Sequence, residues 1–157
     1  MLVATKLRRL RVTRVDLRRR KADDPPVTQR EVEVILVRQL ASYLTVPVFV
    51  VDAAGTLIFF NEAAEVLMSR RFEETEELTL EEWSALLQPS SPDGGPLPHH
   101  ERPLVRALQD RRPSHARLLV TQQATGERLP IEVTAFPIVG QAGRDLGAVA
   151  LFWTDPG

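Results

Sequence analysis

One stretch of the sequence decides the fold: Val48-Phe-Val-Val-Asp52-Ala-Ala-Gly55-Thr-Leu-Ile-Phe-Phe60-Asn61-Glu-Ala-Ala-Glu65. Residues 48–51 and 56–60 are runs of β-branched and aromatic side chains, which favour strands. Asp52 and Gly55 lie between the two runs, and both are residue types that turn the chain back on itself. This part of the stretch therefore predicts a β-hairpin.

A helix is predicted directly after the hairpin. Asn61 is a typical helix cap, because its side-chain oxygen can accept hydrogen bonds from the free amides of Ala63 and Ala64. Residues 62–68 are mostly good helix formers. The chain is thus expected to pass from sheet to helix at Asn61.

This block resembles the opening of PAS sensor domains, in which two strands joined by an Asp-x-x-Gly turn lead into an Asn-capped helix. The resemblance extends over residues 46–155. Residues 93–108 look like the loop and long helix that cross the sheet in this family, and residues 131–138 and 146–152 look like its last two strands. The resemblance implies a sensor or interaction domain.

The rest of the sequence predicts three more strands and another helix. From Ser114 the side chains alternate between polar and apolar, and turn residues follow at 124–127 and 140–144. Thr79-Leu-Glu-Glu82 is a capping box, which predicts a helix with Trp83, Leu86 and Leu87 facing inward. The fold class expected is α+β, with a five-stranded antiparallel sheet and helices packed on one face.

Charge divides the chain into a basic tail and an acidic domain. Nine Lys and Arg residues and one Asp lie among residues 1–21, which carry +8 while the rest of the chain carries −9. Asp23-Asp-Pro-Pro26 disfavours helix and marks a junction. We therefore expect a disordered basic tail with its junction over residues 1–26, an amphipathic helix over 27–45, and the PAS-like domain over 46–155.

The N-terminal helix is predicted to begin at a second capping box, Thr28-Gln-Arg-Glu31, and to reach Leu44. Its apolar side chains recur at spacings of three and four residues and form one stripe. The stripe consists of Val32, Ile35, Leu36, Leu40 and Tyr43. Two partners stay open for it: the protein's own sheet, or the same helix in a second copy, as in many PAS dimers.

Several kinds of chemistry are excluded or disfavoured. The chain has no cysteine, so it forms no disulfide and cannot form the cysteinyl-flavin photoadduct of flavin-binding PAS sensors. It lacks the common hydrolase, phosphate-binding and dinucleotide motifs, and the sequence therefore predicts no enzyme, no catalytic residue and no metal site. His99 and His100 lie near the family's haem-ligand position, but adjacent histidines before a proline are typical of exposed residues. Haem is disfavoured and the cofactor stays unknown.

The sequence thus predicts a stand-alone PAS module that senses a small ligand, mediates protein–protein interaction, or does both. We expect a homodimer whose output passes to a separate effector protein such as a kinase or transcription factor, so that transcription regulation is one outcome. No apolar run could span a bilayer, and a cytoplasmic location is expected. Two alternatives are a nucleic-acid-associated regulator that uses the basic tail and a ligand-free dimerisation module.

An apolar pocket is expected between the sheet and the helices over residues 61–108, because a curved sheet covered by short helices leaves a concavity. Such a pocket would bind a small apolar molecule without transforming it. The residues predicted to line it are Val48, Val50, Ile58, Phe60, Met68, Leu104, Leu108, Leu119 and Val133. The alternative is a pocket filled by the protein's own side chains.

Overall fold

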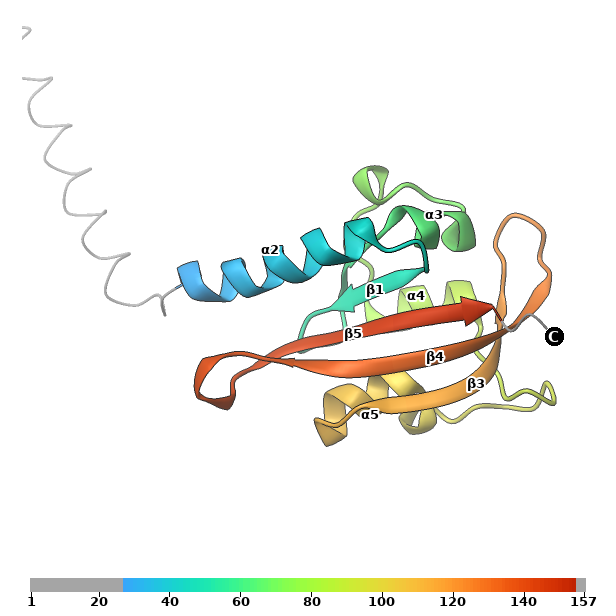
Figure 1. Ribbon diagram of the computed structural model, residues 1–157. Helices are drawn as coiled ribbons and strands as arrows, with labels where there is room; N and C mark the ends of the chain where they lie inside the picture. The colour runs from blue at the N-terminus through green and yellow to red at the C-terminus, as the bar shows by residue number, and fades with distance from the viewer. Residues whose placement is uncertain (1–26, 155–157) are drawn as a thin grey trace, which may run out of the picture. The chain divides into compact units, whose positions relative to one another are not determined.

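The computed structural model of the protein describes residues 27–154, with side chains from Val32 onward. Figure 1 shows their arrangement. In chain order the elements are α2 (Val27–Tyr43), β1 (Val48–Val51), β2 (Leu57–Phe60), α3 (Glu62–Met68), η1 (Phe72–Glu74), α4 (Leu80–Leu87), η2 (His99–Glu101), α5 (Pro103–Asp110), β3 (Ser114–Thr121), β4 (Arg128–Val139), η3 (Gln141–Gly143) and β5 (Asp145–Thr154).

The five strands form one antiparallel sheet in the order β2-β1-β5-β4-β3. The first strand and the last strand lie side by side in its centre, with Phe49 opposite Ala150. The predicted five-stranded antiparallel sheet is therefore confirmed.

The turn between β1 and β2 is held by the carboxylate of Asp52. Its Oδ1 accepts hydrogen bonds from the amides of Ala54 at 2.9 Å and Thr56 at 3.0 Å. These contacts are the local reason that an aspartate begins a tight turn. The predicted hairpin is confirmed with its turn chemistry.

Two hydrophobic clusters lie on opposite faces of the sheet. Side chains alternate along β1, so that Phe49 and Val51 join the larger cluster under α3, α4 and α5, while Val48 and Val50 join a smaller one. The smaller cluster includes Ala41 of α2. The helices between β2 and β3 thus share one face of the sheet, and α2 packs on the other.

The helix α4 begins as the sequence predicts. Thr79 Oγ1 accepts from the amide of Glu82 at 3.3 Å, and Glu82 Oε2 accepts from the amide of Thr79 at 2.8 Å. The hydrogen bond that the backbone amide of Thr79 donates to the carboxylate is the main cause that lowers the pKa of Glu82. Trp83 and Leu87 are buried and Leu86 is half-buried, which confirms the predicted inward face.

The helix α2 extends from Val27, one residue before the predicted cap Thr28, to Tyr43, one residue short of Leu44. The predicted capping box falls on side chains that lie outside the described residues, as does the basic tail with its proposed disorder and nucleic-acid role. Among the described residues, no helix combines the length and apolar character needed to cross a membrane.

Candidate functional site

Strand parity places four of the nine predicted pocket residues away from the helices α3 to α5. Val48, Val50 and Ile58 lie on the side of the sheet that α2 covers, in or against the smaller cluster. Leu119 lies between Leu118 and Val120, which both face the larger cluster, and alternation therefore turns its side chain to the other face. This corrects the predicted lining, because side-chain parity in a strand is set by its register.

The other five predicted residues lie on the helix-covered side. Phe60, Met68, Leu104 and Val133 belong to the larger cluster and Leu108 packs against it. Within this cluster a cavity of about 30 Å³ remains, and of the nine predicted residues it is lined by Leu104 and Val133. Such a volume is close to that of a single water molecule.

Most of the lining of this cavity was not predicted as such. Its walls also include Trp83 and Leu87 of α4, Leu118 and Val120 of β3, and Phe152 of β5. Ala150 also lines the cavity, where its small side chain leaves space against the sheet.

Trp83 fixes α4 over the sheet beside this cavity. Its indole Nε1 donates a hydrogen bond to the carbonyl oxygen of Gly55 at 3.0 Å. Its ring meets that of Phe49 edge to face, with centroids 6.2 Å apart. The tryptophan is therefore fixed at both its polar and its apolar end.

A second, open groove of about 410 Å³ adjoins the cavity, since Pro89 and Arg102 line both. Glu81, Ser84 and Gln88 of the α4 region and His99 of η2 also line this groove. Arg102 Nη1 lies 3.5 Å from Nδ1 of His99, and burial lowers the pKa of the Arg102 guanidinium. Charged and polar side chains thus share the lining of the groove with Ala85 and Pro89, whereas the lining surface of the adjoining cavity is apolar.

The predicted stripe on α2 faces outward. Val32, Ile35, Leu36, Leu40 and Tyr43 are all exposed, whereas Val37 and Ala41 pack toward the sheet. The sheet is therefore not the partner of the predicted stripe, because α2 packs on the sheet through the face of Ala41. Pairing of the stripe with a second copy stays a prediction.

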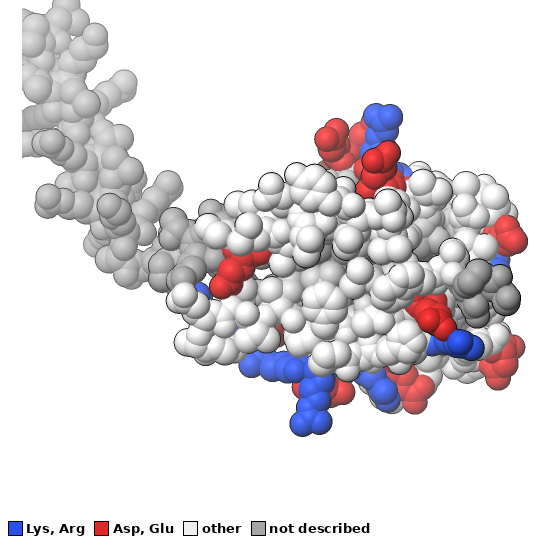
Figure 2. Space-filling model, viewed as in Figure 1, with Lys and Arg blue, Asp and Glu red and all other residues white. Residues whose placement is uncertain are grey.

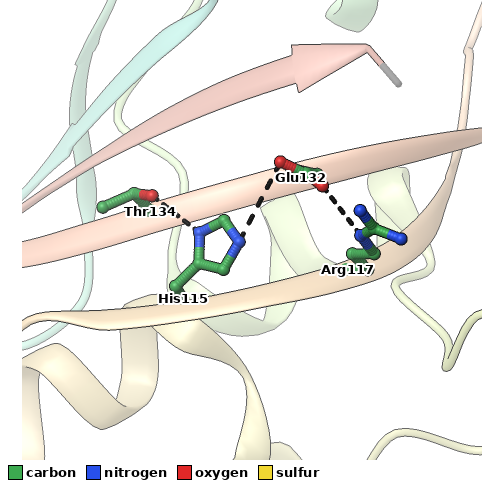
Figure 3. Close-up of polar contacts among 4 residues, drawn as sticks. All are labelled: His115, Arg117, Glu132 and Thr134. Carbon is green, nitrogen blue, oxygen red and sulfur yellow. Dashed lines mark hydrogen bonds and ion pairs between the residues drawn. The ribbon is translucent and has the colours of Figure 1, made fainter. Parts of the chain in front are cut away.

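The outer face of the β3–β4 hairpin carries a polar network (Figure 3). His115 Nδ1 lies 2.9 Å from Thr134 Oγ1, and Arg117 Nε donates to Glu132 Oε1 at 2.7 Å. His115 Nε2 lies 4.0 Å from the second oxygen of Glu132. All four residues are cross-strand neighbours on a surface-facing edge, where such pairs support the register of the strands.

Comparison with known proteins identifies the family. The family model described as PAS fold matches residues 42–154. The chain belongs to the PAS family. Members of this family are generally sensor modules rather than enzymes.

Several solved structures share the fold, among them two that are named as PAS domains. The PAS domain of nitrogen regulation protein NR(II) from Vibrio parahaemolyticus has a TM-score of 0.54 at 21% identity, covering 76% of this chain and 98% of that one. The PAS domain of Bordetella pertussis BvgS has a TM-score of 0.60 at 16% identity, covering 80% of this chain and 88% of that one. The phage VqmA–DPO complex has a TM-score of 0.57 at 15% identity, covering 83% and 56%. No curated protein matches the sequence.

The two histidines considered as haem ligands lie in η2 of the PAS domain, and both are exposed. Within residues 27–154, no three side chains of His, Cys, Asp or Glu gather closely enough to hold a metal ion.

Proposed function

We propose that this PAS domain is a signalling module that pairs with a second copy of itself through α2 and senses a small molecule between α4 and α5. The observation that carries the first part is the character of the exposed side of α2. From Val32 to Tyr43 the exposed residues are Val32, Ile35, Leu36, Gln39, Leu40, Ser42 and Tyr43. None of them is charged, which is unusual for a helix side that faces water.

The charged side chains of this helix segment point elsewhere. The guanidinium of Arg38 lies over the ring of Phe59, 5.1 Å from its centroid, and 5.3 Å from that of Phe72. Glu33 is half-buried. An apolar, uncharged side can meet an identical copy without repulsion, as a two-fold dimer requires.

The surface beside α2 is also largely uncharged. Figure 2 shows the view of Figure 1 with most Lys, Arg, Asp and Glu side chains toward the margins and a largely uncharged middle. Phe136 on β4 and Trp153 on β5 are also exposed apolar residues, and they alternate with Ala135 and Phe152, which face the helices α3 to α5, so they lie on the side of the sheet that α2 covers. They add apolar area that favours association over a solitary domain.

The dimer predicts the behaviour of a double variant. Leu36→Glu with Leu40→Glu places two carboxylates in the paired face, and burying them weakens dimerisation by at least about a hundredfold. The variant remains folded, because both side chains are exposed in the single domain. Sedimentation equilibrium should show a dimer for the wild-type protein and a monomer for the variant, with unchanged circular dichroism.

A matched control adds the same charge elsewhere. Val66→Glu with Ala124→Glu changes two exposed residues outside α2, one on α3 and one in the β3–β4 turn. This variant should remain a dimer. A wild-type protein that is already monomeric at tens of micromolar would contradict the pairing, as would a control that dissociates to the same extent.

Ligand sensing is the second part of the proposal, and the adjoining cavity and groove support it. Small-molecule sites are concave and mostly apolar with a few placed polar groups, and the groove and cavity together have this character. Among the solved structures similar to this chain, that of phage VqmA is a complex with DPO. The chemistry of the groove indicates which kind of molecule this chain would accept.

A further inference from the structure

Three buried side-chain polar atoms lack a hydrogen-bond partner among the described residues, and two of them line the same groove. They are Ser84 Oγ on α4 and Arg102 Nε at the start of α5, and the third is Glu33 Oε2. A buried polar atom without a partner costs free energy, and native proteins leave few of them. Two such atoms from separate segments in one groove point to a missing partner.

Ser84 is the more deeply buried of the two, with 8% of its surface exposed. A serine inside a helix ordinarily donates to the carbonyl of the preceding turn when it is buried. Ser84 makes no such bond. Its hydroxyl is therefore free to donate to a molecule in the groove.

Arg102 brings a positive charge that no carboxylate of the described domain neutralises. The ion pairs among the described residues involve other side chains. Its Nη1 lies 3.5 Å from Nδ1 of His99, and the guanidinium is partly desolvated. A guanidinium in this situation favours an anion with planar oxygens, which it binds with charge-assisted hydrogen bonds.

The position of Arg102 also determines which kind of group fits at the other end of the ligand. Arg102 and Pro89 line both the groove and the apolar cavity, whose walls include Trp83 and Leu104. An anion held at Arg102 therefore has an apolar recess beside it. The cavity of about 30 Å³ accepts a group the size of a methyl without displacement of the surrounding side chains.

We propose that this groove binds a small organic carboxylate with a short apolar tail, an inference that names the ligand class for the sensing role proposed above. The guanidinium of Arg102 and, after a rotation that exposes it to the groove, the hydroxyl of Ser84 donate to the carboxylate oxygens. The tail enters the recess beside Trp83. Glu81 lies on the rim of the groove, where its charge opposes the anion and weakens binding.

The two tryptophans of the chain provide an internal comparison for the test. The indole of Trp83 borders the cavity, whereas Trp153 lies partly exposed on β5. In ¹H–¹⁵N spectra of the full chain, titration with butyrate should shift the Trp83 indole signal in a saturable way and leave the Trp153 signal in place. Butyramide, the neutral analogue of the same shape, should bind at least about tenfold more weakly, because it lacks the charge.

Variants test the assigned roles. Arg102→Gln should weaken butyrate binding at least about tenfold and Ser84→Ala about fivefold, by loss of the donors. Glu81→Gln should tighten it. Arg106→Gln removes an exposed charge of the same sign on the same helix and should leave affinity within about twofold, as expected for screened surface charges.

Thermal stability separates ligand binding from a structural role. A guanidinium that awaits a ligand contributes nothing to the unliganded fold, so Arg102→Gln should not lower the melting temperature. A lowered melting temperature together with unchanged butyrate affinity would overturn the proposal. Equal affinities for butyrate and butyramide would overturn the carboxylate while the sensing role stands, whereas no Trp83 shift with either would contradict both.

Discussion

Replacement of Gly147 by alanine is expected to destabilise the domain by about 3 kcal/mol or more, since strained backbone and overpacking combine at this position. Gly147 has φ of +125°, a conformation that residues with a side chain rarely adopt. A Cβ atom here would overlap the carbonyl oxygen of Val51 and lie 2.9 Å from the Cα of Asp52. Both contacts are with backbone of the central strand pair, which cannot move aside without breaking the β1–β5 ladder.

Urea denaturation followed by circular dichroism measures this effect, and Gly126→Ala is the matched control. Gly126 also has a positive φ, +70°, but a Cβ there meets nothing within 4 Å. The control therefore isolates the backbone strain, about 1 to 2 kcal/mol. If the two alanine variants lost equal stability, the close approach of β5 to the β1–β2 turn would be refuted as the main cause.

The local parts of the fold could be predicted from the sequence because each depends on residues near one another in the chain. The turn at Asp52 and the capping box at Thr79 each involve contacts across four residues or fewer. The donors and acceptors of both motifs lie within a few residues of one another, and the structure confirms the hydrogen bonds between them. The ordered set of such elements was also sufficient to indicate the family.

The side of the sheet on which each strand residue places its side chain could not be predicted to the same extent. Phe49 and Val50 are both fully buried, one on each side of the sheet, because α2 covers the face opposite to α4 and α5. A strand buried on both faces has no polar alternation to show its parity. The two residues of β1 predicted to line the pocket, Val48 and Val50, therefore face α2 instead.

The groove residues Ser84 and Arg102 could not be predicted from the sequence for another reason. Ser84 and Arg102 are ordinary in sequence: a serine inside an amphipathic helix and an arginine before a proline. They become notable only when the fold brings α4 beside the start of α5 and buries an atom of each without a partner. No periodicity or motif contains that information.

Asn61→Ala is expected to cost about 3 kcal/mol or more, well beyond the loss of an ordinary helix cap. The sequence indicates the cap, and its oxygen indeed accepts from Ala64 N at 3.1 Å. The same oxygen also accepts from Val48 N at 2.9 Å. The side-chain nitrogen lies 3.0, 3.2 and 2.9 Å from the carbonyl oxygens of Ala41, Leu44 and Val46, among which its two hydrogens are shared.

Asn61 therefore joins the end of α2 to β1 and α3, and it does so while only 2% of its surface is exposed. Alanine would leave buried donors and acceptors on several segments without partners. Thr79→Ala is the control, because it removes a helix cap that is exposed and bonds only within α4; it should cost about 1 kcal/mol. Equal losses in urea denaturation for the two variants would contradict the joining role.

Asn61→Asp tests the donor side of the same residue through its pH dependence. The carboxylate keeps an oxygen for Val48 and Ala64 but turns the other toward three carbonyl oxygens, which repel it. Repulsion and burial raise the pKa of the introduced carboxyl in the folded state above its unfolded value of about 4. Stability of the variant is then greatest below that unfolded value and falls as pH rises through the folded pKa, because the folded state binds the proton more tightly. Its deficit relative to wild type should therefore be large at pH 7 and shrink toward pH 4, and a deficit independent of pH would show that the side chain turns away from the three carbonyls.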